Sequence, residues 1–130
     1  MSDLTMLGNK TEAAGSPEKA IIEAFDNKYK RPYLITFEAF EFTSMCPVTH
    51  QPDFATITIS YVPKEKCAES KSLKLYLQSF RNVGMFHEEI VNKILDDFVR
   101  FVEPQEVTVK GDMNPRGGIS IAVEASWVNE

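Results

Sequence analysis

The sequence predicts an α+β domain, a four-stranded antiparallel sheet with two helices on one face. Two observations predict it. Residues 32–43 and 54–62, and again residues 106–113 and 119–127, alternate between apolar and polar positions with the period of a strand. The segment between these two strand pairs instead shows a helical period. The order strand, strand, helix, helix, strand, strand favours antiparallel pairing with the helices on one face of the sheet.

Length and composition indicate a single soluble domain. The chain has 130 residues, of which 43% are hydrophobic and 25% charged, enough for one core. The net charge of −5 argues against an extended surface for nucleic acid. No apolar run approaches the roughly 20 residues that span a bilayer, and the N-terminus lacks the apolar stretch of a secretory signal. We therefore expect a cytoplasmic protein that binds neither nucleic acid nor membranes directly.

The N-terminal segment divides into a tail and the start of the domain. Residues 1–15 are small and polar without a period, which predicts a flexible tail followed by one domain over residues 16–130. Ser16 has the chemistry of an N-cap, and Pro17 suits a first helical position. A short helix is therefore expected to follow, with its apolar positions at Ile21, Ile22 and Phe25.

The later elements follow from their apolar spacing. The first strand has Tyr33, Ile35, Phe37 and Ala39 on one face, and the second has Ala55, Ile57, Ile59 and Tyr61. The first helix is predicted from Leu73, Tyr76, Leu77 and Phe80, and the second from Phe86, Ile90, Ile94, Phe98 and Phe101. A break is expected near residues 82–84, and Glu103 with Pro104 ends the second helix. The sequence NPRGG, residues 114–118, predicts a hairpin between the last two strands.

The turn between the first two strands carries the first candidate for chemistry. Cys46 lies there in the polar sequence FTSMCPVTHQPDF, residues 42–54, which predicts an exposed thiol. Such a thiol is a nucleophile where its surroundings favour the thiolate; the alternative is a buried thiol at a turn. Asp53 has the chemistry to exchange a proton beside it, but is also an ordinary turn residue. A disulfide between Cys46 and Cys67 is not expected in the cytosol.

A second candidate site lies at the predicted start of the first helix. Lys71 and Lys74 are three residues apart in AESKSLKLY, residues 68–76, with Ser70 or Ser72 available as a cap. Two ammonium groups and free amides there suit a phosphate, although a solvated helix face has the same spacing. Arg116 in the predicted hairpin is a further phosphate candidate, because the adjacent glycines allow close approach of the backbone.

A third candidate is the sequence FHEEI, residues 86–90. His87 and Glu88 have the chemistry of an acid or base beside a carboxylate that accepts from an amino-substituted heterocycle. They are also ordinary charges for the first turn of a helix. No metal site is predicted, because His50 and the other possible zinc ligands show no CxxC or HExxH spacing.

Four segments in this order resemble a known family. FTSMCPVTHQPDF, ESKSLKLYLQSFRN, FHEE and NPRGGISI are similar to the short-form 7-cyano-7-deazaguanine reductases, the NADPH-dependent nitrile reductases of queuosine biosynthesis, and the resemblance runs from about residue 21 to 127. It implies a tunnelling fold, in which small units assemble into homo-oligomeric barrels with active sites at subunit interfaces. ESKSLKLY is the distinguishing signature of that family.

The resemblance also implies roles for individual residues. Cys46 would attack the nitrile carbon to give a covalent thioimide, with Asp53 as the proton donor. NADPH would then reduce the adduct, in two steps, to the aminomethyl product. The remaining matches are Glu69, Ser70, His87 and Glu88 for the deazaguanine base, and Lys71, Lys74 and Arg116 for the NADPH phosphates.

Two other functions stay open at this point. One is a zinc hydrolase of the GTP cyclohydrolase type on the same fold, and the other is a non-catalytic module that binds a pterin or purine. No Rossmann GxGxxG motif is present, so NADPH binding depends on the signature lysines and on the resemblance.

Overall fold

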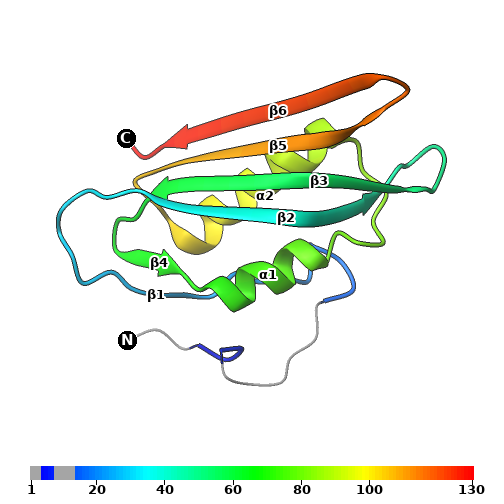
Figure 1. The fold of residues 1–130 in the computed structure, drawn as a ribbon. Coiled ribbons are helices and arrows are strands. Elements are labelled where there is room, and N and C mark those ends of the chain that lie inside the picture. The colour runs from blue at the N-terminus through cyan, green and yellow to red at the C-terminus, as the bar shows by residue number, and fades with distance from the viewer. Residues whose placement is uncertain (1–3, 8–13) are drawn as a thin grey trace.

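A computed structural model describes residues 4–7 and 14–130. Its main sheet has the order β2-β3-β5-β6, and every neighbouring pair is antiparallel. The strands are β2 (Ile35–Met45), β3 (Pro52–Val62), β5 (Glu106–Arg116) and β6 (Ile119–Val128). The four predicted strands are therefore confirmed, and Figure 1 shows β2 and β6 as the two edges of the sheet.

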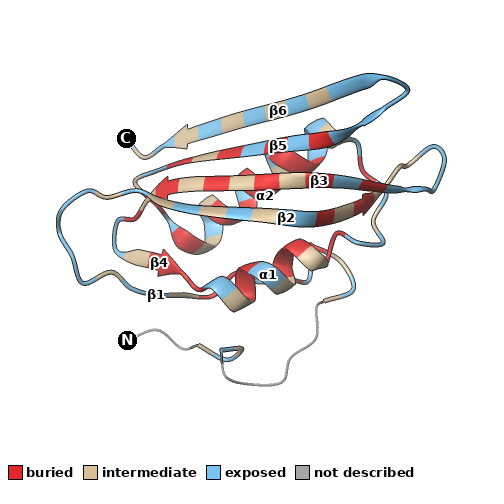
Figure 2. Ribbon diagram, in the orientation of Figure 1, coloured by how far each residue is buried: buried red, intermediate tan, exposed pale blue. Residues whose placement is uncertain are grey.

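Both predicted helices are present and cover one face of this sheet (Figure 1). They are α1 (Ser70–Gln78) and α2 (His87–Val102). The core lies between the helices and the sheet, where fully or almost fully buried side chains alternate along β3 and recur along α2 (Figure 2): Ile57, Ile59, Tyr61, Ile90, Ile94 and Phe98. Burying side chains of this size contributes roughly 1.5–3 kcal/mol each. The predicted apolar faces are thus the ones that fold inwards.

The start of α2 differs from its predicted periodicity. Phe86 is the N-cap residue and is 59% exposed, so it does not belong to the buried face of the helix. At the other end Glu103 adopts a left-handed conformation with φ 51°, and its N–H donates to the carbonyl of Val99. This αL cap ends the helix directly before Pro104, as predicted.

The predicted helix near residues 16–25 is wrong. Residues near Ser16 form only a turn, in which Lys19 N–H donates to the Ser16 carbonyl at 3.1 Å, and a short strand, β1 (Ala24–Asp26), follows. β1 pairs with β4 (Lys66–Ala68), a strand that the sequence pattern did not predict. The capping signal at Ser16 produces only this turn. The backbone groups of residues 24–26 pair with β4, far along the chain, and so do not form a helix.

The face of the sheet opposite the helices is polar. A row of hydroxyl side chains crosses all four strands in register, formed by Thr36, Ser60, Thr108 and Ser126. Two contacts lie within it, Thr36 with Ser60 at 3.2 Å and Thr108 with Ser126 at 2.8 Å. This face is therefore compatible with water, as an antiparallel sheet covered on one side requires.

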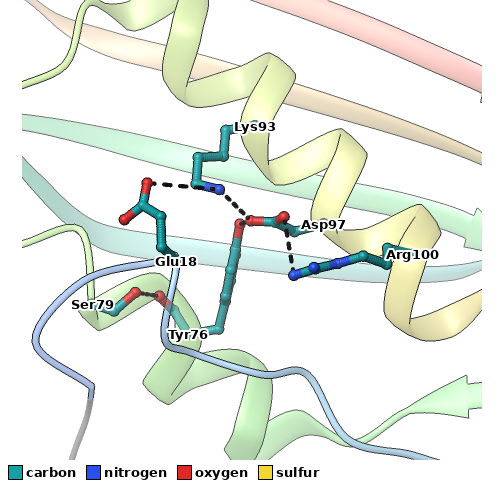
Figure 3. Close-up of polar contacts among 6 residues, drawn as sticks. All are labelled: Glu18, Tyr76, Ser79, Lys93, Asp97 and Arg100. Atoms are coloured by element: carbon teal, nitrogen blue, oxygen red, sulfur yellow. Dashed lines mark hydrogen bonds and ion pairs between the residues drawn. The ribbon is translucent and has the colours of Figure 1, made fainter.

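A buried polar network joins the two helices (Figure 3). The hydroxyl of Tyr76 donates to Oδ2 of Asp97 at 2.5 Å, and Lys93 Nζ lies 3.2 Å from the same oxygen. Glu18 extends the network to the N-terminal segment, 3.9 Å from Lys93. Burial, together with the Asp97 carboxylate, raises the pKa of Tyr76 far above its usual value, so this phenol remains a donor. The network holds α1 against α2 beneath the sheet.

The described part of the N-terminal tail contacts the domain. The backbone N–H groups of Thr5 and Met6 donate to the carboxylate of Glu23 at 2.8–3.0 Å, and so does the Thr5 hydroxyl. Residues 1–3 and 8–13 of the predicted tail lie outside the described residues, and the boundary at residue 16 stays a prediction. No helix in the described part of the chain is long and apolar enough to cross a lipid bilayer.

Candidate active site

Cys46 lies at the tip of the β2–β3 hairpin. Its N–H donates to the Gln51 carbonyl at 2.8 Å, and its own carbonyl accepts from His50 N–H at 2.9 Å. His50, with φ 57°, occupies the left-handed region that lets the chain reverse here. The thiol is free and the residue is half-buried. Backbone hydrogen bonds therefore fix the turn in a conformation that leaves Cys46 accessible to solvent.

The surroundings of Cys46 favour its thiolate. Hydrogen bonds from the Thr49 side chain and from the N–H groups of Thr49 and Val48 lower the pKa of Cys46 below its usual value. Partial burial and the negative charge of Asp53 act in the opposite direction but do not outweigh these bonds. A thiol with a lowered pKa and access to solvent has the properties of a reactive cysteine. Thr49 is a contributor that the sequence analysis missed, although it lies only three residues after Cys46.

The loop before α2, residues 83–85, is hydrogen-bonded to Met45, the last residue of β2 before this turn. Met45 N–H donates to the Val83 carbonyl at 3.0 Å, and Met85 N–H donates back to the Met45 carbonyl at 3.2 Å. This short parallel bridge places the N-terminus of α2, with His87 and Glu88, beside the end of β2. The hairpin and the helix are thus fixed relative to each other by backbone hydrogen bonds.

Asp53 is buried, with 7% of its surface exposed, and both of its carboxylate oxygens have partners. Oδ1 accepts a hydrogen bond from Nη1 of Arg116, at the end of β5. Oδ2 lies 3.5 Å from Nε2 of His87, the first residue of α2. The structure therefore brings together Cys46, Asp53, His87 and Arg116 from four segments, with Glu88 exposed beside them on the first turn of α2.

The other predicted site residues gather at the start of α1. Glu69 is its N-cap, and the carboxylate accepts from Lys71 N–H at 2.7 Å and from Ser72 N–H at 2.8 Å. Ser70 and Lys74 are exposed and line a hollow of about 490 Å³ between α1 and β2. Two cations and a helix start therefore lie together, while the Glu69 side chain, 3% exposed, is engaged in capping the helix.

These two groups of residues lie at opposite ends of β2. Ser70 shares a second hollow with Ile35 and Phe37, at the beginning of the strand, whereas Cys46 directly follows its last residue. The helix α1 runs alongside β2 in the same direction (Figure 1). Eleven residues of strand span roughly 35 Å. One chain therefore does not bring Glu69, Ser70, Lys71 and Lys74 to Cys46.

The comparisons with known proteins agree with the resemblance seen in the sequence. Residues 52–130 match the family model of the QueF-like proteins. The chain is 52% identical to the NADPH-dependent 7-cyano-7-deazaguanine reductase of Porphyromonas gingivalis, over 92% of this chain and 78% of that protein. It is 54% identical to the enzyme of the same name from Streptococcus mutans, over 93% and 76%. The chain belongs to the QueF-like family.

A solved structure supports the fold of this QueF-like chain. The apo crystal structure of the archaeosine synthase QueF-Like is similar with a TM-score of 0.70 at 24% identity, and the match covers 75% of this chain and 95% of the other. At this identity the likeness concerns the fold alone. The expected arrangement, an antiparallel four-stranded sheet with two helices on one face, is therefore confirmed.

Two other residues weighed in the sequence remain: His50, whose N–H donates to the Cys46 carbonyl, and Cys67. His50 is exposed in the turn, and Cys67 is buried on β4, where its sulfur lies 3.6 Å from the Tyr33 hydroxyl. Both cysteines are free thiols. Over residues 4–7 and 14–130, no group of three or more His, Cys, Asp and Glu side chains is arranged to hold a metal ion.

Proposed function

We propose that this QueF-like chain reduces the nitrile of 7-cyano-7-deazaguanine to the primary amine 7-aminomethyl-7-deazaguanine with NADPH, in the cytoplasmic biosynthesis of tRNA queuosine. The observation that carries the proposal is that the buried carboxyl of Asp53 lies at the base of the β2–β3 hairpin whose tip holds Cys46, close enough for its charge to act on the pKa of that thiol. The names of its relatives, NADPH-dependent 7-cyano-7-deazaguanine reductases, supply the substrate and the cofactor.

The first step is addition of sulfur to the nitrile. The Cys46 thiolate forms a C–S bond to the nitrile carbon, and a π electron pair moves onto nitrogen. That nitrogen takes a proton from the Asp53 carboxyl, which leaves a neutral thioimide bound to Cys46. Covalent addition converts an unreactive triple bond into a C=N group that is open to reduction. The exposed thiol and the buried acid beside it match these two roles.

Bound NADPH would supply the two hydrides that convert the thioimide to the imine, with release of the Cys46 thiolate, and the imine to the amine, whose nitrogen takes one further proton. The residues that fit its phosphates are Lys71 and Lys74 at the start of α1, with Arg116 at the hairpin. Lys74 and Arg116 are exposed, as groups that receive a phosphate must be. Amides at the start of a helix add a favourable dipole for an anion.

The base is held by carboxylates from both groups. Glu88, exposed on the first turn of α2, accepts from the guanine-like N–H edge, and His87 lies beside it. Ser70 is exposed at the start of α1, next to Glu69. A carboxylate has about four acceptor positions, so Glu69 keeps capacity for a substrate N–H beyond its two capping bonds.

The complete site forms between chains of a homo-oligomer. The residues at the start of α1 and the residues around Cys46 lie at opposite ends of β2, which supports this proposal. One subunit can then supply Lys71 and Lys74 to a site in which the adjacent subunit supplies Cys46. The two edge strands also have unpaired backbone groups and exposed apolar side chains, with Phe40 70% and Ile119 73% exposed. Strand edges of this kind pair readily with another chain, and closed rings remove them.

The decisive assay follows NADPH absorbance with 7-cyano-7-deazaguanine as the substrate. Two equivalents of NADPH consumed per nitrile are expected, and Cys46→Ala should abolish turnover while the fold is retained. Mass spectrometry of protein with nitrile but without NADPH should find the adduct on Cys46. Cys67→Ala is the matched control and should react normally. An adduct on Cys67, or binding of the nitrile without turnover, would contradict the proposal.

A further inference from the structure

Arg116 contacts the proposed proton donor as well as lying where a cofactor phosphate is expected. Its side chain is 43% exposed, yet Nη1 reaches inwards to Oδ1 of Asp53, whose side chain is only 7% exposed. A guanidinium has five N–H donors in a fixed plane, so one inward contact leaves others directed elsewhere. The pairing is thus compatible with a second partner for Arg116.

The geometry of the strands explains how Arg116 reaches Asp53. The register between β3 and β5 ends at Ala55 and Met113, so Asp53 lies two residues beyond the last position of β3 that pairs with β5. The β5–β6 pairing is irregular between Met113 and Arg116, and the hairpin closes through Gly117 and Gly118 with positive φ angles of 59° and 78°. Arg116 directly precedes this turn and lies three residues after Met113 on β5, so it lies at the same end of the sheet as Asp53.

The two oxygens of Asp53 are consequently not equivalent. Oδ1 accepts a hydrogen bond from the cationic guanidinium of Arg116. Oδ2 lies 3.5 Å from Nε2 of His87, a ring nitrogen that can donate or accept a hydrogen bond. Oδ2 is therefore the oxygen that faces a group able to accept as well as to donate a hydrogen bond.

We propose that Arg116 is the positioning residue of the proton donor: by holding Oδ1 of Asp53, it leaves Oδ2 as the oxygen that delivers the proton when Cys46 adds to the nitrile. The inference rests on the proposed function. As the C–S bond forms, the π pair on nitrogen takes the proton from Oδ2, and Asp53 becomes a carboxylate that Arg116 stabilises. His87 then passes a proton taken from solvent through Nε2 to Oδ2, which restores the Asp53 carboxyl for the next turnover.

The test measures adduct formation with 7-cyano-7-deazaguanine in the absence of NADPH, where a role in cofactor binding has no effect. Arg116→Ala should slow formation of the Cys46 adduct by about tenfold to a hundredfold, since general acid catalysis is typically worth 10²–10⁴. Arg116→Lys, which keeps the positive charge but lacks the planar array of N–H donors of a guanidinium, should recover part of the rate. Arg31→Ala, which removes an exposed cation that is not among the proposed site residues, is the control and should leave the rate unchanged.

A double variant separates positioning from an independent effect. Asp53→Asn should be slow by itself, and adding Arg116→Ala should slow it no further, because Arg116 acts through Asp53. Thermal melting of each variant checks that the fold is retained. Adduct formation at the wild-type rate in Arg116→Ala, with only a raised KM for NADPH, would overturn the inference and leave the proposed function intact. Absence of the adduct in the wild type would overturn both.

Discussion

Gly84 lies directly against Pro47, the residue that follows the candidate nucleophile. A Cβ at Gly84 would stand 3.3 Å from Cα of Pro47, closer than an ordinary van der Waals contact, so one of the two segments would have to shift. The same loop is held to β2 by the hydrogen bonds between Met45 and Val83 and between Met85 and Met45. The position of the Cys46 turn is therefore set partly by the absence of a side chain at Gly84.

Gly84→Ala should displace the Cys46 turn by a few tenths of an ångström and slow adduct formation. A loss of about tenfold is expected, because misplacement of reacting groups by 1 Å can cost about a hundredfold. Stopped-flow measurement of adduct formation checks this, with thermal melting to show that the fold is retained. Gly15→Ala is the control, since a Cβ there meets nothing within 4 Å. Wild-type kinetics in Gly84→Ala would show that the loop yields without moving Cys46.

Thr49→Val should make Cys46 less reactive near neutral pH. The Thr49 hydroxyl is the largest of the influences that lower the pKa of Cys46, so its removal should raise that pKa towards the ordinary value. The thiolate fraction at a given pH then falls, and alkylation by iodoacetamide slows. The measurement is the alkylation rate as a function of pH, whose midpoint should move upwards. An unchanged midpoint would mean that the backbone N–H groups alone set the pKa.

Mixing inactive chains tests whether the site is shared between subunits. Cys46→Ala and Lys74→Glu alter groups at opposite ends of β2, so reassembled mixtures should contain complete sites at about a quarter of their interfaces if subunits mix at random. Turnover should recover accordingly. The pair Cys46→Ala and Glu88→Ala is the control: both residues lie at the same end of one chain, and their mixture should stay inactive. A fully active monomer in sedimentation at assay concentration would contradict a shared site.

The contact between Glu23 and the N-terminal segment should depend on pH. Burial by itself raises the pKa of Glu23, but hydrogen bonds from the Thr5 side chain and from Thr5 and Met6 N–H outweigh it, and the pKa lies below its ordinary value of 4.5. A lowered pKa in the folded state means that the contact contributes stability above pH 4.5 and loses it as the pH falls through the folded value.

Hydrogen exchange at the Thr5 and Met6 amides measures this contact directly. Protection should decrease as the pH falls below 4.5 once the intrinsic pH dependence of exchange is removed. In Glu23→Gln the protection should be weaker and no longer depend on pH in this range. Glu65→Gln, which removes an exposed carboxylate elsewhere, serves as the control. Equal protection in Glu23→Gln would show that other contacts hold residues 4–7.

Local sequence patterns were sufficient to predict the long strands and helices and to indicate the family. The alternation of Ile57, Ile59 and Tyr61 and the helical spacing of Ile90, Ile94 and Phe98 predicted both the elements and their buried faces, because burial of one face imposes a period on the sequence. The short segments FTSMCPVTHQPDF and ESKSLKLY pointed to the family. Each of these signals lies within a few residues along the chain and needs no knowledge of distant contacts.

Tertiary structure decided the features that depend on pairing between distant segments. The capping signal at Ser16 predicted a helix, yet the following residues pair with β4 about 40 residues away, as tertiary pairing overrides a weak local propensity. Arg116, assigned from sequence to a phosphate, lies against Asp53 because the pairing of β3 with β5 puts both residues at the same end of the sheet. Lys71 and Lys74 are separated from Cys46 because α1 runs along β2 in the same direction. The periodicity of a sequence predicts which face of a helix or strand is buried. It does not predict which end of a neighbouring strand a helix will contact.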